Sequence, residues 1–189
     1  MRTMKGLTLV EVLVATAIGV VIMGIMITTY LSSTDLYESQ NTLIDLQSRA
    51  RNAIIFMTTE LKNATRTSAA NPSPNLSIPS TPNNKDIQFY VPEDKNGDGL
   101  ITDSNGLIEW DTDNKIQYQY VPGLEELRRL EKGNQYKIAQ NVSDIRFIDA
   151  SVDSSLAINE VRIILTLSAI SPRRRLFTVT QTGIVRLRN

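Results

Sequence analysis

The chain opens with a long apolar segment. From Leu7 to Leu31 it reads LTLVEVLVATAIGVVIMGIMITTYL, and after Glu11 no charged residue follows until Asp35. At about 1.5 Å per residue, a helix over this segment is roughly 37 Å long, which exceeds a hydrocarbon core of about 30 Å. Residues 7–31 are therefore expected to cross a membrane as a single helix.

The residues before the span predict its orientation. Residues 1–6, MRTMKG, carry two basic side chains, so the positive-inside tendency puts the N-terminus in the cytoplasm and all that follows Leu31 outside. A secretory signal peptide is the competing interpretation. Such a peptide has an apolar core of about 7–15 residues that ends at a small-residue cleavage site. The longer run and the acid near its start fit that description poorly.

An amphipathic pattern continues beyond the span. Apolar residues recur at spacings of three, four and seven, which mark one helical face: Leu36, Leu43, Leu46, Ala50, Ile54, Met57 and Leu61. The other side carries Asp45, Arg49, Arg51, Asn52 and Lys62. No proline interrupts residues 7–66, so one helix of roughly 55–60 residues is predicted, with 32–68 as its amphipathic part. A coiled coil is the alternative, but the stripe covers fewer than four heptads.

The second half of the chain is patterned as strands. Residues 69–86 are rich in proline, serine and asparagine and are expected to form a loop. Residues 87–189 alternate apolar and polar positions, as in antiparallel strands with one solvated face. The clearest segments are 87–91, 116–120, 161–168 and 177–185, and weaker ones lie at 127–130, 136–139 and 145–148. About five strands packed on the amphipathic helix give an α+β head.

The composition excludes several classes of catalytic and metal-binding site. The chain has 189 residues, with 20 basic and 20 acidic residues, no histidine and no cysteine. Zero net charge removes the usual electrostatic basis for nucleic-acid binding, so no nucleic-acid partner is predicted. Without histidine and cysteine there is no Ser-His-Asp or Cys-His system, no thiolate metal site and no disulfide. A catalytic role is therefore not expected, although paired carboxylates and oxygen-ligated cation sites remain open.

The start of the apolar segment resembles a known processing signal. Gly6 is followed by LTLVEVLVA, and this combination is similar to the prepilin signature of type IV pilins and type II secretion pseudopilins. The resemblance implies that a prepilin peptidase cuts between Gly6 and Leu7 and that the new N-terminus is methylated. Glu11 then becomes the fifth mature residue, with an assembly role beside a neighbouring subunit's N-terminal amine. On physical grounds alone, a carboxylate hydrated near the lipid headgroups is the alternative for Glu11.

The order of elements extends the resemblance over most of the chain. A long helix, a proline-rich loop and strands that include NQYKIAQNVSDIRFI (134–148), EVRIILTLSA (160–169) and a terminal VRLRN (185–189) resemble W-type minor pilins and J-type pseudopilins. Unlike many major pilins, the chain has no proline within the apolar helix and no C-terminal disulfide, which favours a minor subunit. The resemblance implies a pilin-like fold and a structural role in initiating or capping a pilus or pseudopilus.

This resemblance also implies partners and a location. The partners are other pilins or pseudopilins through the N-terminal helix, the prepilin peptidase and an inner-membrane assembly platform. The chain would sit in the bacterial inner membrane as a single-pass protein with its head outside, and then enter a pilus or pseudopilus in the periplasm or at the cell surface. Which machine it serves stays open.

An acidic segment in the head is the strongest candidate for ligand chemistry. Residues 93–113 hold seven acids and one lysine, and their start matches D-x-[DN]-x-[DN]-G. By the spacing of a calcium loop, six residues are candidate Ca²⁺ ligands: Asp94, Asn96, Asp98, Leu100 through its carbonyl, Thr102 and Asp103. Position 12 is Asn105, where an EF-hand has glutamate. The ligand that completes the Ca²⁺ coordination shell would therefore be Asp103, Glu109 or Asp111. A solvated acidic loop is the alternative.

Two functions follow from these features. The first is a structural fibre subunit assembled through its N-terminal helix. The second is a single-span inner-membrane protein whose calcium-dependent head binds a ligand outside the cytoplasm. The N-terminal residue of the mature protein discriminates between them.

Overall fold

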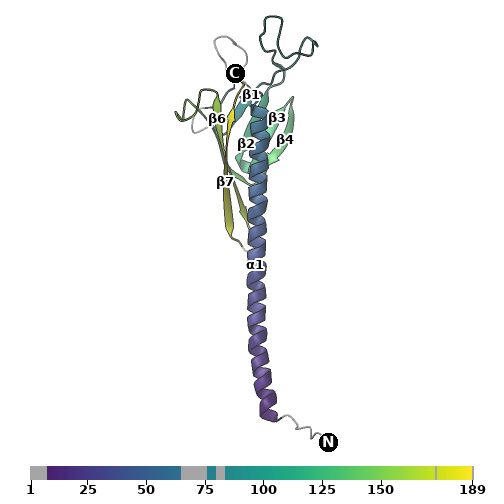
Figure 1. Cartoon of the computed structure of the whole chain (residues 1–189), viewed down its shortest axis with the longest axis vertical. Helices are drawn as coiled ribbons and strands as arrows, with labels where there is room; N and C mark the ends of the chain where they lie inside the picture. The colour runs from purple at the N-terminus through teal and green to yellow at the C-terminus, as the bar shows by residue number, and fades with distance from the viewer. Residues whose placement is uncertain (1–7, 65–75, 80–83, 173, 189) are drawn as a thin grey trace.

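The computed structural model describes residues 8–64, 76–79, 84–172 and 174–188. Within these residues, one long helix forms a stalk, and two antiparallel sheets surround its C-terminal part to form a head (Figure 1). The predicted α+β class with a long N-terminal apolar helix is confirmed. Much of the predicted loop 69–86 lies outside the described residues.

The stalk is a single helix, α1, which spans Leu9–Leu61 over 53 residues. Thr8 caps its N-terminus, and no described residue breaks it. It is the one helix of the described chain that is long and apolar enough to cross a membrane. Its first half stands away from the head (Figure 1), and none of residues 9–33 is buried. The large apolar side chains there are exposed, with Leu9 at 81%.

The second half of α1 buries one face against the sheets. Leu46, Ala50, Ile54, Met57 and Leu61 are buried as the spacing predicted, and Leu43 is partly buried. The polar side of the helix is exposed, as expected. One position in the predicted stripe is wrong: Leu36 is 60% exposed, although Thr34 and Asp35 before it are half-buried, so Leu36 does not lie on the covered side of the helix.

Seven strands are present in the described residues, two more than the approximate number predicted. The first sheet has the order β1(Ile87–Phe89)–β2(Ile116–Val121)–β3(Glu126–Glu131)–β4(Asn134–Ala139), and the second has the order β5(Val142–Asp149)–β6(Glu160–Ile170)–β7(Leu176–Arg186). The three weakly patterned segments became β3, β4 and β5. In β4 most side chains are exposed, so its sequence gives little of the alternation that marks a half-buried strand.

The two sheets share one core with α1. Tyr118 and Phe89 from the first sheet stack with ring centroids 6.0 Å apart, and both are fully buried. From the second sheet, β6 directs Val161, Ile163 and Leu165 into the same core. Because both sheets cover one helix face, the core depends on the position of α1 between them.

Gly183 marks the closest approach between α1 and β7. A Cβ atom added at this glycine would lie 2.6 Å from Ile54 Cγ2 and 3.3 Å from Thr58 Cγ2. Contacts under 3.0 Å require something to shift, and in a packed core the shift displaces neighbouring side chains. The absence of a side chain at position 183 therefore lets the helix lie directly on the strand.

We expect Gly183→Ala to destabilise the head by about 1–3 kcal/mol through overpacking. The measurement is thermal or urea unfolding of the full chain in nonionic detergent, followed by the fluorescence of Trp110, the single tryptophan, which is 4% exposed. Gly123→Ala is the matched control, because a Cβ there meets nothing within 4 Å. In the Gly183→Ala/Ile54→Ala double variant, the loss of stability should be smaller than the sum of the losses in the two single variants. Equal melting of the Gly183→Ala and Gly123→Ala proteins would contradict the packing described.

Candidate functional site

The N-terminus of α1 is organised by a capping box between Thr8 and Glu11. The Thr8 backbone N–H and hydroxyl donate to Glu11 Oε2 at 2.8 and 2.9 Å, and the Glu11 N–H donates to Thr8 Oγ1 at 3.3 Å. Sequence analysis singled out Glu11 but missed Thr8, although the T-x-x-E spacing is itself the capping signal. Gly6 and Leu7, the predicted cleavage pair, lie outside the described residues.

Glu11 caps the start of α1 through one of its two carboxylate oxygens. Its carboxylate satisfies backbone and hydroxyl donors at the start of the helix, where a negative charge also complements the helix dipole. One of its two oxygens, Oε2, accepts both printed bonds. Among the described residues, Oε1 accepts no hydrogen bond, so it can accept one from another donor.

The acidic segment forms a loop that follows β1 at the end of the head farthest from the N-terminus (Figure 1). Asp94 holds its first turn, since its two carboxylate oxygens accept the N–H groups of Gly97 and Gly99 at 2.7 and 2.8 Å. Asn96 Oδ1 accepts from Asp98 N, and Asp98 Oδ1 accepts from Leu100 N. Gly97 and Gly99 have φ values of 75° and 83°, which side chains rarely adopt.

The predicted ligands do not all belong to one turn. Asp103 accepts the N–H groups of Asn105 and Leu107 at 2.9 and 2.8 Å, in a second turn beside the Thr102–Ile108 bridge. The bond from Leu107, followed by those from Asn105, lowers the pKa of the Asp103 carboxyl.

Of the three acids proposed to complete the shell, Glu109 is the one that contacts the first turn. Its Oε2 accepts Lys95 N at 2.8 Å. Asp111 is 7% exposed, and its carboxylate lies 3.9 Å from Lys132 Nζ.

The donor chemistry of this loop suits a hard cation, but its side chains are not grouped around one. Carboxylate and amide oxygens are the ligands that Ca²⁺ prefers, and each retains lone pairs after accepting one N–H. Within the described residues, however, no three acidic side chains are gathered as a metal centre would require. The loop side chains serve backbone N–H groups in this arrangement.

A buried ionic cluster that sequence analysis missed joins α1 to the first sheet. Glu60 lies near the end of α1, and Arg129 lies on β3; Arg129 Nη2 and Nε donate to Glu60 at 2.6–3.0 Å. Tyr118 Oη on β2 also donates to Glu60, and Arg129 Nη1 donates to Glu131 Oε2 at 2.5 Å. The Arg129 side chain is only 11% exposed.

This environment shifts the pKa values of Arg129, Glu131 and Tyr118. Hydrogen bonding to Glu60 raises the pKa of Arg129, and hydrogen bonding to Arg129 lowers the pKa of Glu131. Burial, together with the Glu60 carboxylate, raises the pKa of Tyr118, which keeps its hydroxyl protonated as a donor. No short-range sequence signal predicts the cluster, because Glu60 and Arg129 are 69 residues apart.

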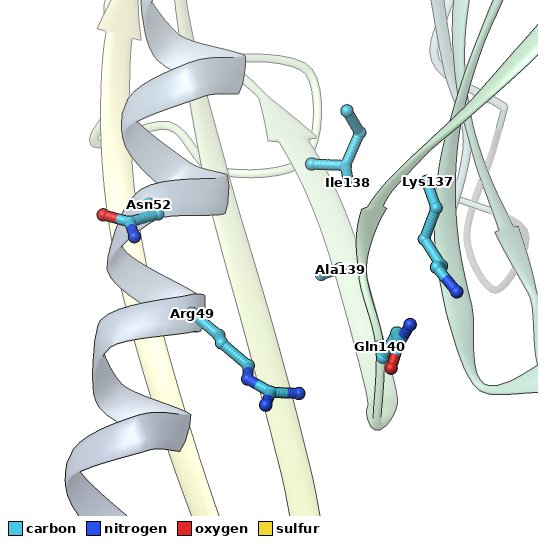
Figure 2. A pocket seen from close by; sticks show the side chains of 6 residues that line it. All are labelled: Arg49, Asn52, Lys137, Ile138, Ala139 and Gln140. Carbon is cyan, nitrogen blue, oxygen red and sulfur yellow. The ribbon is translucent and has the colours of Figure 1, made fainter.

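Two further cavities lie on the head. One of about 450 Å³ borders the ionic cluster. It is also lined by Arg188 and by Pro92 and Ile101, which lie at the acidic loop. The other, of about 440 Å³, is a groove between α1 and β4 (Figure 2). Neither gathers a nucleophile beside a general base among the described residues.

Comparisons of the chain with protein-family models, with curated proteins and with solved structures found no match.

We expect Arg129→Met to lower the free energy of unfolding by about 3–5 kcal/mol, because it leaves Glu60 charged and largely buried without its partner. Unfolding of the full chain in detergent, followed by Trp110 fluorescence, measures the loss. The matched control is Arg128→Met on the same strand, which should cost less, because the Arg128 side chain is 27% exposed against 11% for Arg129 and its partner Glu126 keeps Lys137 as a second partner. Replacing both ends, as Glu60→Leu/Arg129→Met, should restore part of the stability. Equal effects of the Arg128 and Arg129 substitutions would refute the assignment.

Proposed function

We propose that the protein is a minor pilin-like subunit that helps to initiate or cap a type IV pilus or a type II secretion pseudopilus. The observation that carries the proposal is the continuity of α1. An unburied apolar half with one acid near its start leads without a break into a half that forms the core of the head. Such a helix inserts in a membrane and then leaves it to pack with other helices, while the head stays folded.

The proposed processing gives the capping box a second purpose. Cleavage after Gly6 would create an α-amino cation at Leu7, one residue before the Thr8 cap and one helical turn from Glu11. In a bundle of such helices, the unused Oε1 of Glu11 would accept from a neighbouring chain's amine. A buried pair adds little net stability, but a misplaced subunit would leave a charge unpaired, so the pair selects the correct axial position.

The proposed partners and location follow from this function. Other pilins or pseudopilins would contact the apolar half of α1, and a prepilin peptidase and an assembly platform would act on it in the inner membrane. The head would lie outside the cytoplasm, because the basic residues precede the span.

The test is the mass of the mature N-terminus in cells that contain a prepilin peptidase. We expect loss of residues 1–6 and a methylated Leu7, and we expect Gly6→Val to leave the precursor uncut in the membrane. Glu11→Leu is the matched variant: it should be processed normally but incorporated poorly into sheared fibres. An intact N-terminus in the wild-type chain, or a cut near residues 30–35, would favour the alternative of a single-span membrane protein with a ligand-binding head.

We further propose that the first turn of the acidic loop binds Ca²⁺ as a structural ion. Asp94, Asn96 and Asp98 would supply side-chain oxygens, Leu100 its carbonyl and Thr102 its hydroxyl or a water. Of the possible closing acids, Glu109 is favoured over Asp103, because Glu109 contacts Lys95 while Asp103 holds the second turn. With no bidentate glutamate at position 12, the affinity should be on the order of 10⁻⁴–10⁻³ M.

Calcium at 10 mM should therefore raise the melting temperature of the full chain by roughly 3–10 °C, by mass action on the folded state. The measurement is thermal unfolding in detergent with calcium, with magnesium or with a chelator. Asp98→Ala is the matched variant, since alanine has no side-chain oxygen to bind the cation. A shift that is absent, or that is equal in the Asp98→Ala protein, would exclude this site.

A further inference from the structure

The hairpin of β6 and β7 extends along α1 toward the N-terminal half of the helix (Figure 1). Gly183 of β7 lies against Ile54 of α1. Farther on, the Arg188 N–H donates to the Ala64 carbonyl, so β7 and α1 run in the same direction. Leu176 begins β7 seven residues before Gly183, which is roughly 23 Å of strand. Because this length equals about 15 residues of helix, β7 begins beside roughly residue 40 of α1, and the turn before it lies closer to the apolar segment.

Burial along α1 places the start of the head close to the predicted membrane span. Residues 9–33 are all exposed, and Thr34 and Asp35 are the first half-buried residues of the helix. Thr34 follows Leu31, the end of the apolar segment, by three residues, or roughly 4.5 Å of helix. The lipid headgroups add about 5–7 Å to each side of the hydrocarbon core. The end of the hairpin therefore lies near the outer headgroups of a membrane that residues 7–31 cross.

The side chains at this end combine positive charge with exposed apolar surface. We call Ile170, Arg174, Arg175 and Leu176 the hairpin tip. Both arginines are exposed, and among the described residues no carboxylate lies within ion-pair distance of either. Ile170 and Leu176 face each other across the two strands, and each is 67% exposed. Guanidinium groups bind phosphate oxygens, and apolar side chains beside them favour the boundary between headgroups and acyl chains.

We propose that the hairpin tip binds the phosphate groups of anionic lipids in the membrane that α1 crosses. Arg174 and Arg175 contact the phosphates, while Ile170 and Leu176 enter the headgroup layer. The contact holds the head against the membrane surface with the hairpin side of α1 turned toward the lipid. The inference rests on the proposed membrane span, but it requires neither cleavage of the N-terminus nor assembly into a fibre.

The absence of cysteine from the sequence allows one fluorescent label at a chosen position of the full chain. Pro172→Cys labels the exposed turn without removing a tip residue, and Thr182→Cys labels an exposed position farther along β7 as the matched control. Ser33→Cys, just after the apolar segment, reports on the span itself. Each protein is reconstituted in lipid nanodiscs of 30% phosphatidylglycerol and 70% phosphatidylcholine, with and without lipids that carry a nitroxide quencher on the headgroup. We expect strong quenching at positions 33 and 172, and at least threefold weaker quenching at position 182.

Charge variants then test the recognition of lipid. Arg174→Gln/Arg175→Gln in the Pro172→Cys chain should lower the quenching at least threefold, whereas Arg174→Lys/Arg175→Lys should retain most of it, because lysine keeps the charge. Nanodiscs of phosphatidylcholine alone should also lower it, and Trp110 fluorescence before labelling confirms that each variant is folded. Quenching at position 172 that is no stronger than at 182, or that the glutamine variant leaves unchanged, would overturn the proposal. If position 33 is quenched in that experiment, the membrane span stands; if position 33 is not quenched, the span fails together with the tip contact.

Discussion

The structure depends on one constraint: the two halves of a single helix, α1, lie in different surroundings. The first half of α1 has apolar side chains on every side, and none of residues 9–33 is buried, so this half suits lipid or other helices. The second half has one apolar face, and the two sheets bury it. Because the same rigid element serves both halves, any shift of the head along α1 would move it relative to whatever covers the apolar half.

The head therefore fixes its position on the helix by steric and by ionic means. Gly183 allows β7 to lie against Ile54, so helix and strand interlock at one level. Farther along, Glu60 binds Arg129 and Tyr118, which come from two strands of the other sheet. Apolar packing alone tolerates sliding, whereas a buried carboxylate with two specific donors has few acceptable positions. We therefore expect the ionic cluster to contribute specificity of placement more than net stability.

The sequence predicted those features of the fold that depend on residues close together along the chain. The helix and its buried face could be predicted because period and composition are local. Leu36 was misplaced because spacing alone does not show which side of the helix is covered at that level. Strand β4 was weak in sequence since most of its side chains are exposed. The Glu60–Arg129 pair was invisible, since 69 residues separate its members and only the fold brings them together. In the acidic loop, spacing identified the first turn but could not tell that Asp103 belongs to the next one.

Zero net charge conceals an uneven distribution of charge along the chain. The loop at the far end of the head (Figure 1) holds seven of the 20 acidic residues, and the remaining sequence has 19 basic and 13 acidic residues. At physiological ionic strength, charges more than about 8 Å apart are largely screened, so the two regions scarcely attract across solution. Such charges act only at short range, when surfaces meet. In the assembly proposed above, they would add direction to the contact between subunits, because lipid-facing side chains provide attraction without direction.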